Sequence, residues 1–92
     1  MSSIRVRIPA ALRSQTNEQS DVEIEADSVR GVIDALDREF PGIGARLRDD
    51  AGELRRFVNV YVNGEDVRFL DGLSTPIKPG DEVSIIPAVA GG

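Results

Sequence analysis

The chain contains no cysteine and no histidine, and these two absences exclude several kinds of chemistry. Without cysteine there are no disulfides, no thiolate nucleophiles and no thiolate metal sites. Without histidine the chain lacks the side chain that most often acts as a general base or metal ligand near neutral pH. No apolar run approaches the roughly 20 residues of a membrane span, and the first residues do not resemble a signal sequence. We therefore expect a cytoplasmic protein that binds no membrane.

Positive charge is also scarce, because the chain has 11 Lys and Arg residues and 16 Asp and Glu residues, which gives a formal net charge of −5 at pH 7. This balance disfavours binding to nucleic acid and favours a basic docking surface on a partner protein. Only one of the cations, Lys78, is a lysine. The acidic group Asp49, Asp50 and Glu53 lacks the spacing of a calcium-binding loop, so we predict no metal site.

The first half of the chain contains two alternating segments and one helical segment. Residues 4–8 and 21–26 alternate apolar and charged side chains, which is typical of half-buried strands, and the polar residues 14–20 between them indicate a loop. We expect these strands to form an antiparallel hairpin. Ser28 is a candidate N-cap for a helix whose apolar side chains recur at helical spacing up to Phe40, and Pro41 and Gly42 end it. Residues 43–48 are predicted to form a second, short helical turn.

The second half is predicted to contain further strands. Residues 56–63 have Val58, Val60 and Val62 on one face, Asn63-Gly64 signals a turn, and residues 67–69 suggest a short edge strand. The turn at residues 79–81 leads into a last strand at residues 82–86, which stops at Pro87.

The order of the elements, two strands, a helix and then further strands, favours an α+β fold in which the helix packs across one face of a mixed sheet. We predict a β-grasp (ubiquitin-like) fold of four to five strands with one main helix, in which the first and last strands are parallel and central. Residues 1–87 are predicted to form this domain, and residues 88–92 a flexible tail. The predicted core consists of Ile4, Val6, Ile8, Val22, Ile24, Val29, Val32, Ile33, Leu36, Phe40, Leu47, Val58, Val60, Val62, Val83 and Ile85.

The segment Ala88-Val89-Ala90-Gly91-Gly92 carries the main functional prediction. Glycine is costly to order, so a Gly-Gly end is suited to threading its carboxylate into a narrow active site on another protein. The alternative is a frayed end without function. Alternation also directs a second set of side chains away from the helix, where they are predicted to form a docking face beside the tail: Phe57, Asn59, Tyr61, Ser84 and Ile86. The alternative is that this face merely covers the sheet.

Three segments together resemble the prokaryotic ubiquitin-like sulfur carriers, a family that serves molybdopterin, thiamin and cysteine synthesis. They are residues 57–68 (FVNVYVNGEDVR), residues 79–83 (PGDEV) and residues 86–92 (IPAVAGG). The resemblance covers the whole chain and is greatest to the actinobacterial carriers of cysteine biosynthesis. Asp66 and Arg68 match family positions, and we expect them to form a turn and a surface ion pair, with a partner contact as the alternative.

This resemblance implies a protein co-substrate rather than an enzyme. An E1-like enzyme would use ATP to adenylate Gly92, and sulfur transfer would give a thiocarboxylate that is carried covalently on Gly92, with Gly91 before it. The implied partners are this adenylating enzyme, a pyridoxal-phosphate-dependent cysteine synthase and a metalloprotease that releases the product. No cofactor is expected on the chain itself, and Pro87, Val89 and Ala90 join the predicted partner-binding residues.

Four alternatives remain open on the sequence. The chain could serve as the small subunit of molybdopterin synthase, bound to that enzyme's large subunit, or as a carrier for another sulfur-containing metabolite. It could instead be a ubiquitin-like modifier joined through Gly92 to target lysines, or a plain interaction module. The sequence does not distinguish the pathway, the sulfur donor or the oligomeric state.

Overall fold

The computed structural model of the chain describes residues 3–56 and 58–87, with Pro87 described by its backbone alone. Its strands are β1 (Ser3–Arg7), β2 (Asp21–Glu25), β3 (Val58–Val62), β4 (Glu65–Asp66) and β5 (Glu82–Pro87). Its helices are α1 (Val29–Glu39) and α2 (Ile43–Leu47), with 3₁₀ turns η1 (Ala10–Gln15), η2 (Val67–Phe69) and η3 (Gly72–Ser74).

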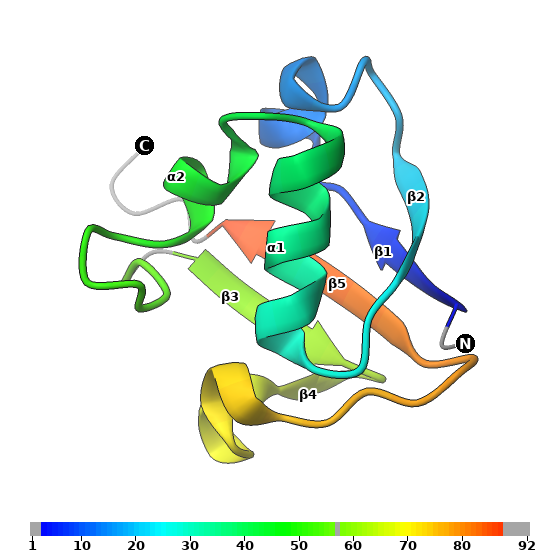
Figure 1. The fold of residues 1–92 in the computed structure, drawn as a ribbon, viewed down its shortest axis with the longest axis vertical. Helices are drawn as coiled ribbons and strands as arrows, with labels where there is room; N and C mark the ends of the chain where they lie inside the picture. The colour runs from blue at the N-terminus through cyan, green and yellow to red at the C-terminus, as the bar shows by residue number, and fades with distance from the viewer. Residues whose placement is uncertain (1–2, 57, 88–92) are drawn as a thin grey trace.

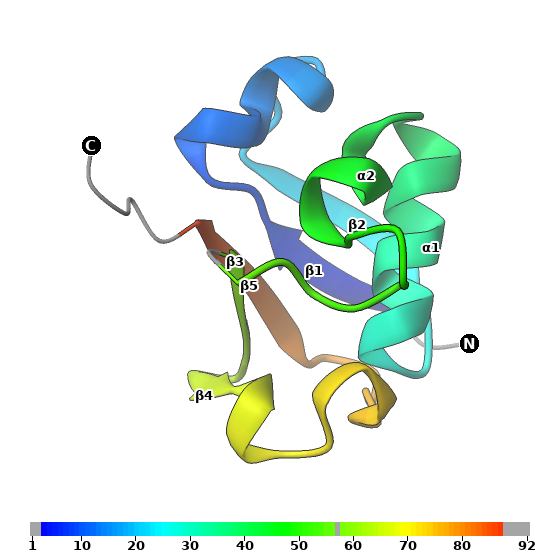
Figure 2. The same ribbon diagram turned by 90° about the vertical axis from the view of Figure 1, so that its left-hand side faces the viewer.

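The five strands form one mixed sheet in the order β2-β1-β5-β3-β4 (Figure 1). β1 and β5 are parallel neighbours, whereas β1–β2, β3–β5 and β3–β4 are antiparallel pairs. Both helices lie on the same side of the sheet, which leaves its other face open (Figure 2). This arrangement confirms the predicted β-grasp fold, including the central parallel pair of the first and last strands.

The core lies between the sheet and the helices, and every residue predicted for it from the sequence is buried. Helix α1 presents the fully buried Val29 and Leu36 to the sheet, because apolar side chains at helical spacing share one face. The sequence prediction missed five further core residues, which come from the 3₁₀ turns, from α2 and from the segment before β5: Leu12, Ile43, Val67, Leu73 and Ile77.

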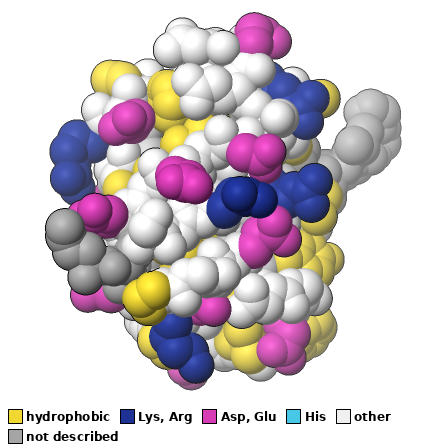
Figure 3. Space-filling view, turned by 90° about the vertical axis from the view of Figure 1, so that its right-hand side faces the viewer, with side chains coloured by type: hydrophobic (Ala, Val, Ile, Leu, Met, Phe, Trp, Pro, Cys, Tyr) yellow, Lys and Arg dark blue, Asp and Glu magenta, His cyan; other side chains and the backbone are white. Residues whose placement is uncertain are grey.

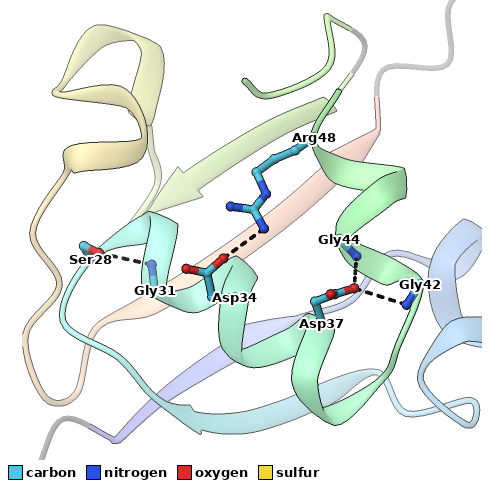
Figure 4. Close-up of polar contacts among 7 residues, drawn as sticks. All are labelled: Ser28, Gly31, Asp34, Asp37, Gly42, Gly44 and Arg48. Atoms are coloured by element: carbon cyan, nitrogen blue, oxygen red, sulfur yellow. Dashed lines mark hydrogen bonds and ion pairs between the residues drawn. The ribbon is translucent and has the colours of Figure 1, made fainter. Parts of the chain in front are cut away.

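The start of α1 is fixed by its predicted cap. The Ser28 hydroxyl accepts a hydrogen bond of 3.1 Å from the Gly31 amide, as an N-cap serine does (Figure 4). Val29 also donates its amide to the Thr75 carbonyl at 3.0 Å. The second bond ties the first turn of α1 to the segment that follows η3. The helix is therefore held at its N-terminus both by its own cap and by the loop that precedes β5.

Helix α2 is too short to be stable on its own, and side chains of α1 hold it in place. Oδ1 of Asp37 accepts hydrogen bonds from the amides of Gly42 at 3.1 Å and Gly44 at 2.9 Å (Figure 4). Arg48, directly after α2, forms an ion pair of 2.9 Å with Asp34. These contacts set the position of α2 above the sheet.

One sequence prediction is wrong at the sheet edge. Residues 67–69 were expected to be a short strand, but β4 consists of Glu65–Asp66 and residues 67–69 form the 3₁₀ turn η2. The Asp66 carboxylate accepts the Arg68 amide at 2.9 Å, which caps this turn, and the turn directs Val67 into the core, where it is fully buried. Burial of one side chain thus overrides the strand propensity of the segment.

Charges of both signs are mixed over the side of the molecule where β2 lies (Figure 3). On the open face of the sheet, Arg5 pairs in register with Glu23, and Arg7 with Asp21, and all four are exposed. They form the solvated face that the alternating pattern predicted. Among the described residues, no helix combines the length and the apolar character needed to span a membrane.

Candidate functional site

Strands β3 and β5 bring four of the predicted docking residues together on the open face of the sheet. In the antiparallel register Asn59 lies opposite Ile86, and Tyr61 lies opposite Ser84. Ile86 is 48% exposed, and the other three are half-buried. Their neighbours along both strands point into the core, so these four side chains form a continuous surface at the end of β5.

The remaining predicted site residues fall at or beyond the limits of the described structure. Pro87 ends β5, where its backbone lies opposite Val58 in the register. The others lie outside the described residues and keep the status of sequence predictions: Phe57, Val89, Ala90, Gly91 and Gly92.

A shallow hollow of about 250 Å³ adjoins the four predicted docking residues on the β1 side. It lies where β1 ends and β5 approaches its own end, so it flanks the point at which residues 88–92 follow the sheet. Its lining is mostly apolar, with one guanidinium: Arg7, Ile8, Pro9, Ser84, Ile85 and Ile86. This surface is suited to an apolar side chain of a partner protein.

Arg68 supports the same surface in a way the sequence did not predict. Its guanidinium donates to Oδ1 of Asn59 at 2.8 Å and to the carbonyls of Val58 at 2.8 Å and Arg55 at 3.0 Å. The expected ion pair with Asp66 is wrong, since Asp66 accepts the backbone amide of Arg68 instead. The planar fork of arginine reaches three acceptors at once, which no other side chain does. Arg68 thus joins η2 to the start of β3.

The opposite end of β5 is fixed by a second polar network. Oδ1 of Asn63 accepts the Glu82 amide at 3.0 Å, and its Nδ2 donates to the Asp81 carboxylate at 3.0 Å. The same carboxylate accepts the Lys78 amide at 2.8 Å, and these hydrogen bonds, the Lys78 one foremost, lower the pKa of Asp81 below its usual 3.8. The Asn63-Gly64 turn and the turn before β5 are thereby connected, so β5 is held at its beginning as well as along its length.

A cavity of about 350 Å³ opens on the helix side near the end of β5. Its lining comes from η1, α2, β3, β5 and the segment before β3, and it is apolar apart from two arginines: Ala11, Leu12, Ala45, Arg46, Arg55, Val58 and Ile85. The end of β5 is therefore flanked by a hollow on each face of the sheet.

Residues 3–56 and 58–87 contain no group of three or more Asp and Glu side chains arranged to hold a metal ion. Together, the side chains of Asn59, Tyr61, Ser84 and Ile86 form what we call the platform, on the open face at the end of β5. The sequence reasoning found its strand residues from their period of two. It named Arg68 but missed its hydrogen bonds, because two of the acceptors are backbone carbonyls 10 and 13 positions away, for which no sequence pattern exists.

Comparison with known proteins decides the family. Residues 6–92 match the ThiS family. The chain belongs to the ThiS family. The sulfur carrier protein CysO of Mycobacterium tuberculosis is 49% identical over 92 residues, which cover 98% of this chain and 99% of CysO. This match confirms the resemblance that residues 57–68, 79–83 and 86–92 indicated.

Other ThiS-like relatives extend over the same length. Small archaeal modifier protein 3 of Haloferax volcanii is 37% identical, with 97% of this chain and 98% of that protein covered. The molybdopterin synthase sulfur carrier subunit of M. tuberculosis is 33% identical, with both chains fully covered. Among solved structures, CysO in the Amycolatopsis orientalis BexX/CysO complex superimposes with a TM-score of 0.91 at 46% identity, covering 97% of this chain and 99% of that one.

Proposed function

We propose that this ThiS-family chain is a sulfur carrier that becomes a thiocarboxylate at Gly92 and donates its sulfur in cysteine biosynthesis. The observation that carries the proposal is the 49% identity to a protein named sulfur carrier CysO over almost the whole of both chains. The fold supports it, because β5 lies between β1 and β3 and ends at Pro87, directly before the Ala-Val-Ala-Gly-Gly segment. A strand paired on both sides is a rigid base for a segment that has to enter a partner's active site.

The chemistry requires activation from outside the chain. An α-carboxylate has a pKa of about 3.3–3.7 and is an anion at neutral pH, so it is a poor electrophile. In the proposed reaction a Gly92 carboxylate oxygen attacks the α-phosphorus of ATP on an E1-like enzyme and displaces pyrophosphate. Hydrosulfide then attacks the acyl carbon, and AMP leaves with the bonding electron pair. The products are the Gly92 thiocarboxylate and AMP.

The subsequent step also takes place on partner enzymes. The thiocarboxylate sulfur forms a bond to the β-carbon of an aminoacrylate held by a pyridoxal-phosphate-dependent cysteine synthase. A metalloprotease then hydrolyses the adduct, releasing cysteine and restoring Gly91-Gly92. Apart from the reacting C-terminal group of Gly92, none of these steps needs an acid, base or nucleophile from this chain, which therefore acts as a co-substrate. The open face around Tyr61, Ser84 and Ile86 is the proposed contact with the activating enzyme.

The test is the intact mass of the chain after incubation with an E1-like enzyme, Mg-ATP and sulfide. The expected result is a mass increase equal to the replacement of one oxygen by one sulfur. A chain lacking Gly92 is the matched control and should remain unmodified at an unchanged melting temperature. If the full chain also stays unmodified with an enzyme that activates another carrier in the same assay, the proposal is wrong.

A second experiment separates the pathways. The thiocarboxylate form is supplied either to a cysteine synthase with O-phosphoserine or to a molybdopterin synthase large subunit with precursor Z. Cysteine formation is expected, and transfer only in the second reaction would assign the chain to molybdopterin synthesis. That alternative has the weaker support, since the molybdopterin synthase subunit is 33% identical and CysO 49%.

Protein modification is the second candidate function, and one observation favours it. A relative of 37% identity is named a small archaeal modifier protein. A modifier would use the same adenylate but transfer the Gly92 acyl group to a lysine amine of a target, with loss of AMP. Mass spectrometry of trypsin-digested host proteins, searched for lysines that carry residues 69–92 of this chain, with and without its gene, tests that function directly, since Lys78 precedes Pro79 and Arg68 is the last cleavable position.

A further inference from the structure

The cavity on the helix side of β5 is separate from the platform on the open face, and no role has been assigned to it so far. Its walls include the buried side chains of Leu12, Val58 and Ile85, and it opens beside α2. Apolar walls alone would take any apolar side chain. The lining also includes two arginines, Arg46 and Arg55, which favour a ligand that carries a negative charge.

Arg55 is fixed in place, because its Nε atom donates to the Ala45 carbonyl at 2.9 Å. Arg46 is exposed on α2 beside it. Ion pairs within residues 3–56 and 58–87 join Arg7 to Asp21 and Arg48 to Asp34, and none involves Arg46 or Arg55. The cavity lining contains no carboxylate. In a chain of net charge −5, two guanidiniums without an acidic partner in this part of the structure lie at one apolar opening.

These features fit a short apolar segment that ends in a carboxylate. Guanidinium groups bind carboxylates through charge-assisted hydrogen bonds, and apolar walls take alanine and valine side chains. Residues 88–92 supply both, with Ala88, Val89 and Ala90 followed by the carboxylate of Gly92. We infer that this cavity is a binding site for the chain's own C-terminal segment, with Arg46 and Arg55 receiving the terminal carboxylate.

The segment begins next to the proposed site. Pro87 lies opposite Val58, which lines the cavity, and the Val58 amide bonds to the Arg55 carbonyl at 3.0 Å. Five extended residues reach about 16 Å, and they start beside a residue of the cavity wall. The occupant is therefore held at high effective concentration by its own attachment, and docking needs no second molecule.

The effect of this docking on sulfur transfer rests on the proposed function. A Gly92 thiocarboxylate carries the same negative charge as the carboxylate, so it occupies the same site. Docking shields the thiocarboxylate from water and competes with insertion into a partner enzyme. A partner that binds the open face through Ile86 leaves the helix side free, so carrier binding and tail release are separate steps.

The test compares amide and arginine Nε NMR signals of the full chain with those of residues 1–87. The expected result is a set of chemical-shift differences at Ala11, Ala45 and the Arg46 and Arg55 side chains, independent of protein concentration. The double variant Arg46→Gln and Arg55→Gln should lose these differences and should show a higher titration midpoint for the Gly92 carboxylate, because the opposite charges that favour its ionised form are gone. Arg38→Gln, an exposed arginine on α1, is the matched control and should retain the native midpoint.

Two outcomes would overturn the inference. Shift differences that are absent around the cavity would show that the segment does not dock there. Differences that grow with protein concentration would assign the cavity to the tail of a second copy. Neither readout involves ATP, sulfide or a partner enzyme, so a failure here is distinguishable from a failure of the carrier function.

Discussion

The carboxylate of Asp37 accepts the Gly44 amide at 2.9 Å, and a Cβ at position 44 would lie 2.9 Å from the carboxyl carbon of the same side chain. The contact that fixes α2 on α1 therefore requires a residue without a side chain at position 44. Contacts this close do not occur for real Cβ atoms, so an alanine there displaces the carboxylate that positions its own amide. The α1–α2 junction therefore needs both the carboxylate at position 37 and the absence of a side chain at position 44.

The first prediction concerns the stability of this junction. Asp37→Ala removes the acceptor of two amides and should lower the free energy of unfolding by about 1–2 kcal/mol, and Gly44→Ala should lower it by about 1–3 kcal/mol. The double variant should lose less than the sum, because both changes act on one contact. Urea denaturation measures all three variants. Asp50→Ala, an exposed aspartate in the loop after α2, is the control, and additive losses would contradict a shared contact.

The second prediction concerns the pH dependence of folding. Hydrogen bonds from the Lys78 amide and Asn63 hold the pKa of Asp81 below its unfolded value of 3.8. A depressed folded pKa contributes stability that is present above 3.8 and is lost as pH falls through the folded pKa. Asp81→Asn should therefore flatten the decrease in stability below that pH. Denaturation midpoints measured from pH 6 downward, at about one-unit steps, test it. An equal slope in both proteins would contradict the linkage.

Most of the fold can be predicted from the sequence, because the spacing of apolar residues changes where strands give way to the helix. Alternation at residues 4–8, 21–26 and 82–86 and helical spacing from Val29 to Phe40 each describe a face that must be buried. The topology follows in turn, because a helix between two groups of strands covers one face of the sheet that they form. The same alternation places Tyr61 and Ser84, two of the predicted docking residues, on the open face, and the register places them opposite each other.

The remainder depends on contacts that have no period. Leu12 and Val67 are buried from 3₁₀ turns, where no repeat marks the inward side. Arg68 was expected to pair with Asp66, since opposite charges near each other suggest an ion pair. It instead donates to the Val58 and Arg55 carbonyls, a choice set by the path of the backbone after the Asn63-Gly64 turn.

Arg68 gives the third prediction. Arg68→Lys keeps the charge, but one ammonium group cannot reach Asn59 and two backbone carbonyls as the guanidinium fork does. We expect Arg68→Lys and Arg68→Met each to lower the free energy of unfolding by about 1 kcal/mol. In both variants the amide hydrogens at the start of β3 should exchange with solvent faster. Hydrogen–deuterium exchange measures this, with Arg5→Lys on β1 as the control. Full recovery in Arg68→Lys would show that charge alone matters.

The fourth prediction tests the docking face directly. Ile86 is 48% exposed beside the hollow at the end of β5, so Ile86→Asp places a charge where we expect an apolar partner contact without disturbing the core. Steady-state kinetics with the activating enzyme should give a roughly tenfold higher KM, equivalent to about 1.4 kcal/mol of binding energy, at an unchanged melting temperature. Phe69→Asp is the matched control, because Phe69 is 87% exposed but lies in η2 at the edge of the sheet. If Phe69→Asp raises KM and Ile86→Asp does not, the activating enzyme binds the η2 edge, and the open face is a solvated surface of the sheet.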